Sequence, residues 1–421
     1  MAESIREGKS KVLDRESVRR LFDLRGSYNA FSGGGYTGDP YPRWHELRER
    51  APVHEGVVHE LSGYDGPAMF QGLPYPDRPH FSAFSFETCD AALRDSELFA
   101  SSAAEERVDT TEPAMYNSIL AMGGAQHRRY RALVQPSFVP SKAQWWIRNW
   151  IEETVGALID NFVDDGRAEL NVDFAAAIPV LTITGSFGVP VEQALVIRES
   201  VTDTPTMLGI LAPIVAARRE APQDDLISVL VEAEYTDDNG SSHRLSDAEI
   251  YSFAMLLLTA GSGTTWKQLG ITLAALLERP AVLDAVRNDR SLVKPAIEEA
   301  LRWTPTDPMF SRHVVRDTEF FGMTLTEGSV IHLCLGAANR DPVRWDRPDD
   351  YDVRRALKPA LAFGNGPHVC LGMHVARAEM TVGINALLDR LPNLRLDPEA
   401  DPPSYIGMYE RGATAIPVVF G

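Results

Sequence analysis

One long apolar segment constrains the fold of this chain more than any other feature. It opens with Ser246-Asp-Ala-Glu249, a capping box in which the serine caps a free backbone amide and the glutamate reaches back. The residues that follow, YSFAMLLLTAGSGTTWKQLGITLAALLE, predict a helix that ends before Pro280. The helix is apolar on nearly every face through Leu258. Such a helix must be covered all round, so we expect it at the centre of a large core.

Helical periodicity also dominates much of the rest of the chain. GAQHRRYRALV, 145–163 and 173–187 carry apolar residues at three- and four-residue spacing, and a further helix begins near Pro295. Short strand-like runs follow it, namely SRHVVRD, EFFGMTL and SVIHLCLG. No Ser/Gly linker divides the chain. We therefore predict a mainly α fold with a minor β region, as one helix-rich domain over 21–421 after a flexible segment, 1–20.

Charge and cysteine usage exclude several classes of protein. The formal net charge of −18 on 421 residues argues against a nucleic-acid or anionic-membrane surface. The three cysteines have no CxxC spacing, so neither a disulfide framework nor a zinc knuckle is expected. The N-terminal residues lack the apolar run of a signal peptide or membrane anchor. We expect a soluble protein of the reducing cytoplasm.

The segment FGNGPHVCLG, 363–372, contains one of those cysteines between closely spaced glycines. Glycines let the backbone approach a flat object closely. The residues 371–380 predict a helix, so Cys370 lies just before a helix N-terminus, where amides and the helix dipole favour a thiolate. A thiolate in such a loop suits a ligand to the metal of a planar cofactor. A buried, inert cysteine is the other interpretation.

This segment resembles the haem-binding loop of the cytochrome P450 family. The matching positions are Phe363, Gly364, Gly366, His368, Cys370 and Gly372. The resemblance implies the cytochrome P450 fold, with small antiparallel sheets, and haem b (heme, iron protoporphyrin IX) whose iron is bound by Cys370. Glu299-Ala-Leu-Arg302 is similar to the family's ExxR pair, in which side chains at i and i+3 share a helix face.

Other motifs of the family follow in its order. HRRYR, 127–131, resembles the HxxxR helix, whose His127 and Arg131 would hold haem propionates. Arg312 and His368 stand where two further propionate-binding residues are expected. A buried dianionic rim needs charge-assisted donors from several elements. An exposed basic helix face is the other interpretation of HRRYR.

The stretch 260–265, AGSGTT, resembles the oxygen-binding part of the family's central helix. Small residues, Ala260 and Gly261 among them, would let the helix lie against the haem. Thr264 would donate a hydrogen bond to dioxygen and help to steer protons.

Three departures from the family pattern stand out. Gly263 takes the position before the threonine where an acid is usual, so water or, more weakly, Ser262 would have to relay protons. The usual third ionic partner of the ExxR pair falls on Asp350, and either Arg347 replaces it or the network is built differently. The span 189–224 is short for the two helices that roof the pocket, which predicts a trimmed lid.

The resemblance implies a monooxygenase that inserts one oxygen atom of O2 into a small hydrophobic substrate, by hydroxylation or oxidative demethylation. No GxGxxG follows a strand, so electrons would come from a separate ferredoxin and its reductase. Gly263 suggests an alternative, a peroxide-driven oxygenase or a coupling or rearrangement enzyme. A haem-binding sensor or carrier without catalysis is a third hypothesis. By position, the residues expected to line the substrate pocket are Met115, Tyr116, Leu257, Met309, Phe310 and Met408.

Overall fold

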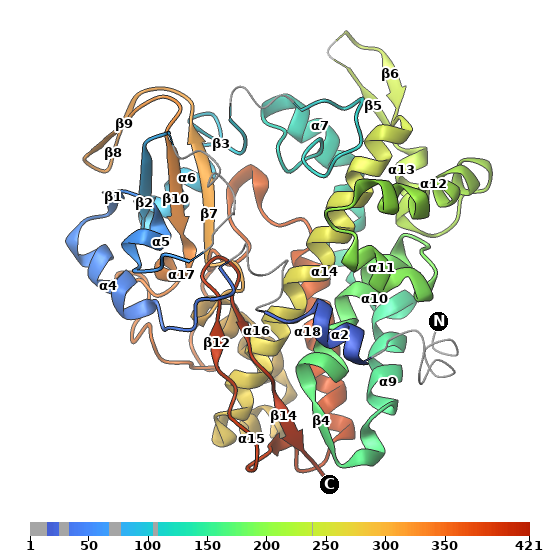
Figure 1. Ribbon diagram of the computed structural model, residues 1–421, viewed down its shortest axis with the longest axis vertical. Coiled ribbons are helices and arrows are strands. Elements are labelled where there is room, and N and C mark those ends of the chain that lie inside the picture. The colour runs from blue at the N-terminus through green and yellow to red at the C-terminus, as the bar shows by residue number, and fades with distance from the viewer. Residues whose placement is uncertain (1–14, 25–32, 67–76, 104–107, 238) are drawn as a thin grey trace.

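The computed structural model describes residues 15–24, 33–66, 77–103, 108–237 and 239–421. It consists of a large helical part and a smaller part built on a mixed sheet, which lies on the left in Figure 1. The mainly α fold expected from the sequence is confirmed.

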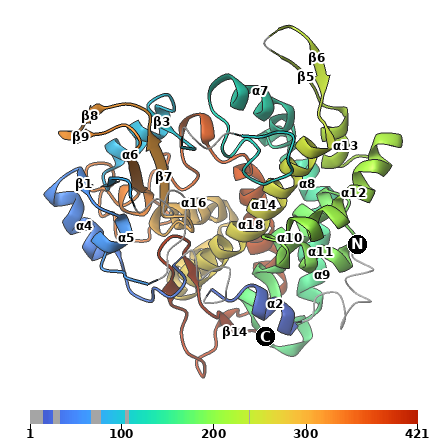
Figure 2. The ribbon, with the colours of Figure 1, turned by 45° about the horizontal axis from the view of Figure 1, so that its top comes forward.

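The helical part is built around α14 (Asp247–Leu277), which runs obliquely through it in both views (Figures 1 and 2). The capping box is present: the Ser246 hydroxyl accepts from the Glu249 amide at 3.3 Å, and Glu249 accepts from the Ser246 amide at 2.7 Å. Most side chains of α14 are buried, because α10 and α16 pack along it. The central position expected for this helix is therefore confirmed.

The other helices surround α14. Those of the main body are α7 (Gly124–Val134), α8 (Ala143–Trp146), α9 (Glu152–Asp160), α10 (Ala177–Ser186), α13 (Leu226–Glu232), α15 (Pro280–Asn288), α16 (Val293–Trp303) and α18 (Met373–Arg390). A π-helical turn, Ile147–Ile151, joins α8 to α9, and a second one, Asn171–Ala175, precedes α10. The helices beside the sheet are α4 (Tyr41–Arg50), α5 (Val58–Leu61), α6 (Phe86–Arg94) and α17 (Leu335–Ala338).

The largest sheet has the strand order β1-β2-β10-β7-β3. Its strands are β1 (Val53–Glu55), β2 (His80–Ala83), β3 (Phe99–Ala100), β7 (Met309–Val314) and β10 (Val330–Cys334). β10 pairs in parallel with β2 and antiparallel with β7, so Ile331 lies opposite Arg312. This pairing sets Arg312 in a buried central strand.

The remaining sheets are small and antiparallel. They pair β5 (Glu234–Thr236) with β6 (Ser242–Arg244), β8 (Thr318–Phe320) with β9 (Met323–Leu325), and β12 (Tyr405–Ile406) with β13 (Gly412–Ala413). A three-stranded sheet orders β11 (Arg395–Leu396), β14 (Pro417–Val419) and β4 (Arg167–Glu169).

Some boundaries differ from those expected. The described part of segment 1–20 lies in α2 (Arg15–Leu21), where Arg15 forms an ion pair with Asp173; residues 1–14 are outside the described ranges. A single domain over 21–421 stays a prediction.

The span 189–224 holds two helices, α11 (Ala194–Glu199), of six residues, and α12 (Thr204–Glu220). Among the described helices, none combines the length and the hydropathy that crossing a membrane requires.

Candidate active site

The loop that carries Cys370 is fixed by short backbone hydrogen bonds. The Cys370 amide donates to the Phe363 carbonyl and the Gly364 amide donates to the Leu361 carbonyl, each at 2.8 Å. Gly364 and Gly366 have φ near +70°, which favours glycine. A Cβ on Gly366 would also collide with the carbonyl oxygen of Leu93 in α6. The loop thus needs its glycines partly for its own turn and partly for its close approach to α6.

Cys370 lies three residues before α18, which begins at Met373 rather than at Leu371. Its side chain has accessible surface, yet protein atoms surround the thiol and raise its pKa to about 11. The Gly372 amide and the guanidinium of Arg131 lower this pKa, as expected at a helix start, but burial outweighs them. We interpret the accessible surface of Cys370 as facing inward.

Four cationic or hydrogen-bonding side chains gather next to Cys370. The rings of His127, on α7, and His368 have centroids 4.1 Å apart. Arg131, one turn further along α7, donates to the Val369 carbonyl at 2.7 Å. Arg312 on β7 is close enough to depress the pKa of His368, which burial and the neighbouring cations together lower to about 3. The tertiary structure thus brings together all four residues expected to bind propionates.

Neither guanidinium of this group has an anionic partner in the described part of the chain. Arg312 is 7% exposed, its only hydrogen bond there is to the Ser311 carbonyl, and burial lowers its pKa to about 10. Nε2 of buried His127 has no hydrogen-bond partner there. Unpaired buried cations are costly, so these residues fit an anionic group, and two haem propionates supply one.

One face of α14 carries the residues expected near oxygen. Ala260 is exposed although most residues of this central helix are buried, and Thr264 is half-buried. Residues at i and i+4 share a helix face, and the Thr264 hydroxyl donates to the Ala260 carbonyl at 3.5 Å. Ser262 is fully buried and donates to the Thr259 carbonyl.

The two glycines of this stretch lie against neighbouring helices. A Cβ on Gly261 would come within 3.0 Å of Ile183 on α10. A Cβ on Gly263 would lie 3.2 Å from a guanidinium nitrogen of Arg198, a residue of α11 that is 3% exposed. The position where an acid is usual therefore faces a buried cation. Arg198 gave no signal in the sequence, because α11 meets α14 only in the folded chain.

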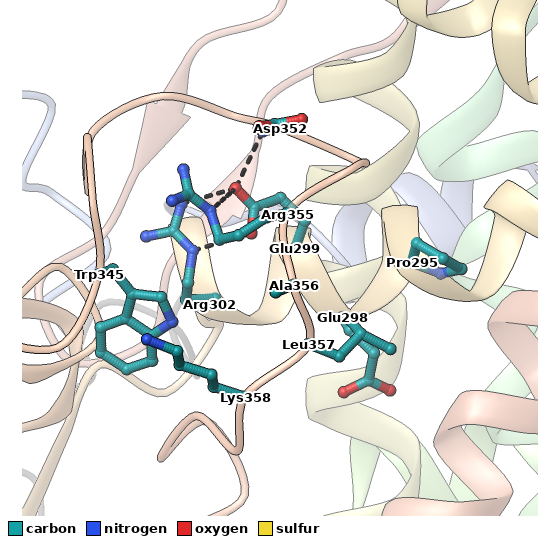
Figure 3. Close-up of a pocket in the computed structure, with 10 residues that line it drawn as sticks. All are labelled: Pro295, Glu298, Glu299, Arg302, Trp345, Asp352, Arg355, Ala356, Leu357 and Lys358. Carbon is teal, nitrogen blue, oxygen red and sulfur yellow. Dashed lines mark hydrogen bonds and ion pairs between the residues drawn. The ribbon is translucent and has the colours of Figure 1, made fainter.

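The Glu299–Arg302 pair is buried and bidentate, at 2.7 and 2.8 Å (Figure 3). Its third partner is Arg355, whose Nε lies 3.0 Å from Glu299. Of the two alternatives, a network built differently is the one found. Arg347 is not the partner, because it is at the surface and pairs with acidic residues, Asp350 among them. Arg355 comes four residues after Tyr351, whereas the family pattern places the partner just before that aromatic residue.

The hollow drawn in Figure 3 belongs to this network. It is lined by Pro295, Glu298, Glu299, Arg302, Trp345, Asp352, Arg355, Ala356, Leu357 and Lys358. Its central charges already bind one another, so we assign it no ligand.

The apolar residues expected in the substrate pocket are dispersed. Met309 and Met408 are buried in a small core with Trp44, beside the sheet. Leu257 and Met115 pack in or against the main core, Phe310 packs against the core of the sheet, and Tyr116 is 61% exposed. The pocket wall stays a prediction.

Comparisons with known proteins agree with this geometry. The family model for cytochrome P450 matches residues 209–408. The putative cytochrome P450 YjiB of Bacillus subtilis (strain 168) is 30% identical over 380 residues, covering 84% of this chain and 88% of that protein. The cytochrome P450 monooxygenase PikC of Streptomyces venezuelae is 30% identical over 386 residues, 87% of each chain.

Solved structures extend the likeness to the fold. The cytochrome P450 PksS of the bacillaene polyketide synthase from Bacillus subtilis 168 superposes with a TM-score of 0.77 at 26% identity, covering 91% of this chain and 97% of that one. The P450 fold expected from the sequence is confirmed. The chain belongs to the cytochrome P450 family, whose members are haem-dependent monooxygenases.

Proposed function

We propose that this chain is a haem-thiolate monooxygenase that inserts one oxygen atom of O2 into a small hydrophobic substrate, by hydroxylation or oxidative demethylation. A separate ferredoxin-type protein and its reductase supply the electrons. The observation that supports this most is the pair of guanidinium groups of Arg131 and Arg312 near His368 and Cys370, which have no carboxylate partner in the described chain.

Different residues of the chain would hold different parts of the cofactor. Cys370 would bind the iron, and the propionates would be held by His127, Arg131, Arg312 and His368. When bound, haem supplies the redox chemistry of O2, and a thiolate ligand pushes electron density toward the oxygen–oxygen bond. Phe363 and the loop glycines fix the position of the sulfur.

Thr264 is suited to hold dioxygen and a proton. Its hydroxyl bond to the Ala260 carbonyl is long, 3.5 Å, and such a weak bond is readily exchanged for a better one. Ala260 leaves open surface beside that hydroxyl.

Spectroscopy and isotope labelling test the proposal. The reduced, carbonyl-bound protein should have the long-wavelength Soret band of a thiolate ligand, and Cys370→Ala should lose it. With ferredoxin, reductase and labelled O2, one labelled oxygen should appear in the product. A band that survives Cys370→Ala would refute the assignment of the ligand.

A specific observation favours a second candidate, a peroxide-driven oxygenase. Position 263 has no acid and faces the guanidinium of Arg198, which has hydrogen-bond donors but no acceptor and so cannot replace the usual acid. Peroxide would supply the oxygen atoms together with the protons, so an acid at position 263 would not be needed. Efficient turnover with peroxide and negligible turnover with ferredoxin and O2 would select this candidate. Gly263→Asp, which sets a carboxylate beside Arg198, should then raise the share of electron-driven product.

A further inference from the structure

Asp307 is an acidic residue that the site described so far does not use. It lies in the connection between α16 and β7 and is half-buried. Its Oδ1 is buried and has no hydrogen-bond partner in the described part of the chain. A buried carboxylate oxygen without a donor is costly to keep, so a donor or cation from elsewhere would stabilise it.

The backbone on both sides of Asp307 is held in place. Gln268 of α14 accepts from the Thr306 amide at 2.9 Å and donates to the Thr304 carbonyl at 3.4 Å. The Arg411 amide donates to the Thr306 carbonyl at 2.7 Å, and the Gly336 amide donates to the Pro308 carbonyl at 2.9 Å. Asp307 is thus presented by a rigid segment, and rigid presentation favours specific binding.

These contacts place Asp307 beside the reactive part of the site. Gln268 is one turn after Thr264 on the same face of α14, so the segment that Gln268 holds lies next to the oxygen-binding stretch. The Asp307 carboxylate is also close enough to Cys370 to raise the pKa of its thiol. Asp307 is therefore near both elements that would hold the haem, the loop of Cys370 and the oxygen-binding stretch of α14.

The charges around Asp307 do not balance. Lys267 is fully buried and forms an ion pair with Glu410, so its charge is already compensated. Asp307 is the second carboxylate next to this one ammonium group. Burial, then Glu410, raise its pKa to about 7, while Lys267 lowers it. One further positive charge would complete the cluster.

We propose that Asp307 recognises a cationic amine on the substrate, so that the enzyme takes small hydrophobic compounds that carry a positively charged nitrogen. This inference rests on the proposed function and adds the substrate class to it. The carboxylate accepts the charge of the nitrogen, while the hydrophobic part of the substrate is held over the reactive centre.

Three probes of one shape and different charge test the inference: benzyltrimethylammonium, neopentylbenzene and benzylsulfonate. The quaternary nitrogen cannot ligate iron, so a spectral shift reports occupancy of the substrate site. Binding to the haem-loaded protein is measured by spectral titration and by calorimetry. We expect the cationic probe to bind most tightly, the neutral probe less tightly and the anionic probe least. Asp307→Asn should lower the ratio of the cation's affinity to the neutral probe's affinity about tenfold.

The control variant is Asp389→Asn, which removes an exposed carboxylate paired with Arg290. It should leave the affinity ratio unchanged. An equal loss in both variants, or an unchanged ratio in Asp307→Asn, would overturn the inference. Asp307→Ser provides a second variant, and a normal carbonyl Soret band certifies that each variant is folded. A normal band without cation preference defeats this inference alone, whereas a missing band in the wild type defeats the proposed function.

Discussion

Two groups of buried charges in this protein differ in how they are compensated. Around Glu299, two guanidinium groups share one carboxylate, and two backbone carbonyls accept from the remaining nitrogen of Arg302. Around His368, Arg131 and Arg312 lie close together with no carboxylate among the described residues. We call the first group compensated, because each of its guanidinium groups bonds a carboxylate and its other nitrogens bond carbonyls, so it needs no further ligand. An uncompensated group costs stability until an anion binds to it, and this contrast is what separates the scaffold from the site.

The largest effect should come from breaking the compensated group. Glu299→Ala leaves Arg302 and Arg355 buried without their carboxylate, which should cost about 3–5 kcal/mol of unfolding free energy. Urea unfolding of wild type and variant measures the loss. Arg347→Ala, at the exposed ion pairs, should change stability by less than about 0.5 kcal/mol. Comparable losses in the two variants would remove the distinction between buried and exposed ion pairs here.

A smaller effect should identify the third partner. Arg355→Lys keeps the charge but cannot bond Glu299 and the Arg347 and Asp350 carbonyls at once. We expect a loss of about 1–2 kcal/mol in the same unfolding measurement. The matched change Arg347→Lys should be nearly neutral. A larger loss of stability in Arg347→Lys than in Arg355→Lys would instead identify Arg347 as the third partner of the Glu299–Arg302 pair.

The uncompensated group should respond in the opposite way. Arg312→Met removes a buried charge that has no carboxylate partner in the described chain, so the haem-free protein should unfold at the same or higher urea. The haem-loaded protein should instead lose haem about tenfold faster, because one charge-assisted bond is missing. Haem transfer to an acceptor protein measures the rate, with Arg128→Met, at an exposed position of α7, as control. A destabilised haem-free protein would mean that Arg312 supports the fold itself.

The last prediction concerns pH. Burial raises the pKa of Asp307 to about 7, so the folded protein keeps a proton that the unfolded chain releases near its ordinary, lower value. Stability should therefore fall as pH rises from about 4 to about 7, and Asp307→Asn should remove this part of the fall. The urea concentration at the midpoint of unfolding, measured for both proteins across that pH range, tests this prediction. A constant difference between them would show that Asp307 releases its proton at an ordinary pH.

Local features of the chain were predictable because they depend on nearby residues. The capping box at Ser246, the course of α14 and the glycine-rich turn before Cys370 follow from hydrogen bonds and periodicity within a few residues. Contacts between residues far apart in the sequence were harder to predict. Arg355 and Arg198 reach their partners from other elements, and Met309 and Met408 enter a core beside Trp44 that no local pattern indicates.

The family, the central helix and the cysteine that would bind the iron could be inferred from the chain alone, because each depends on a contiguous motif. Which charges have a partner became clear only from the folded structure. Charge balance depends on distances between residues far apart in the chain, such as Glu299 and Arg355, or Asp307, Lys267 and Glu410. Burial then sets the energy of each unpaired charge, and burial is a property of the folded chain alone.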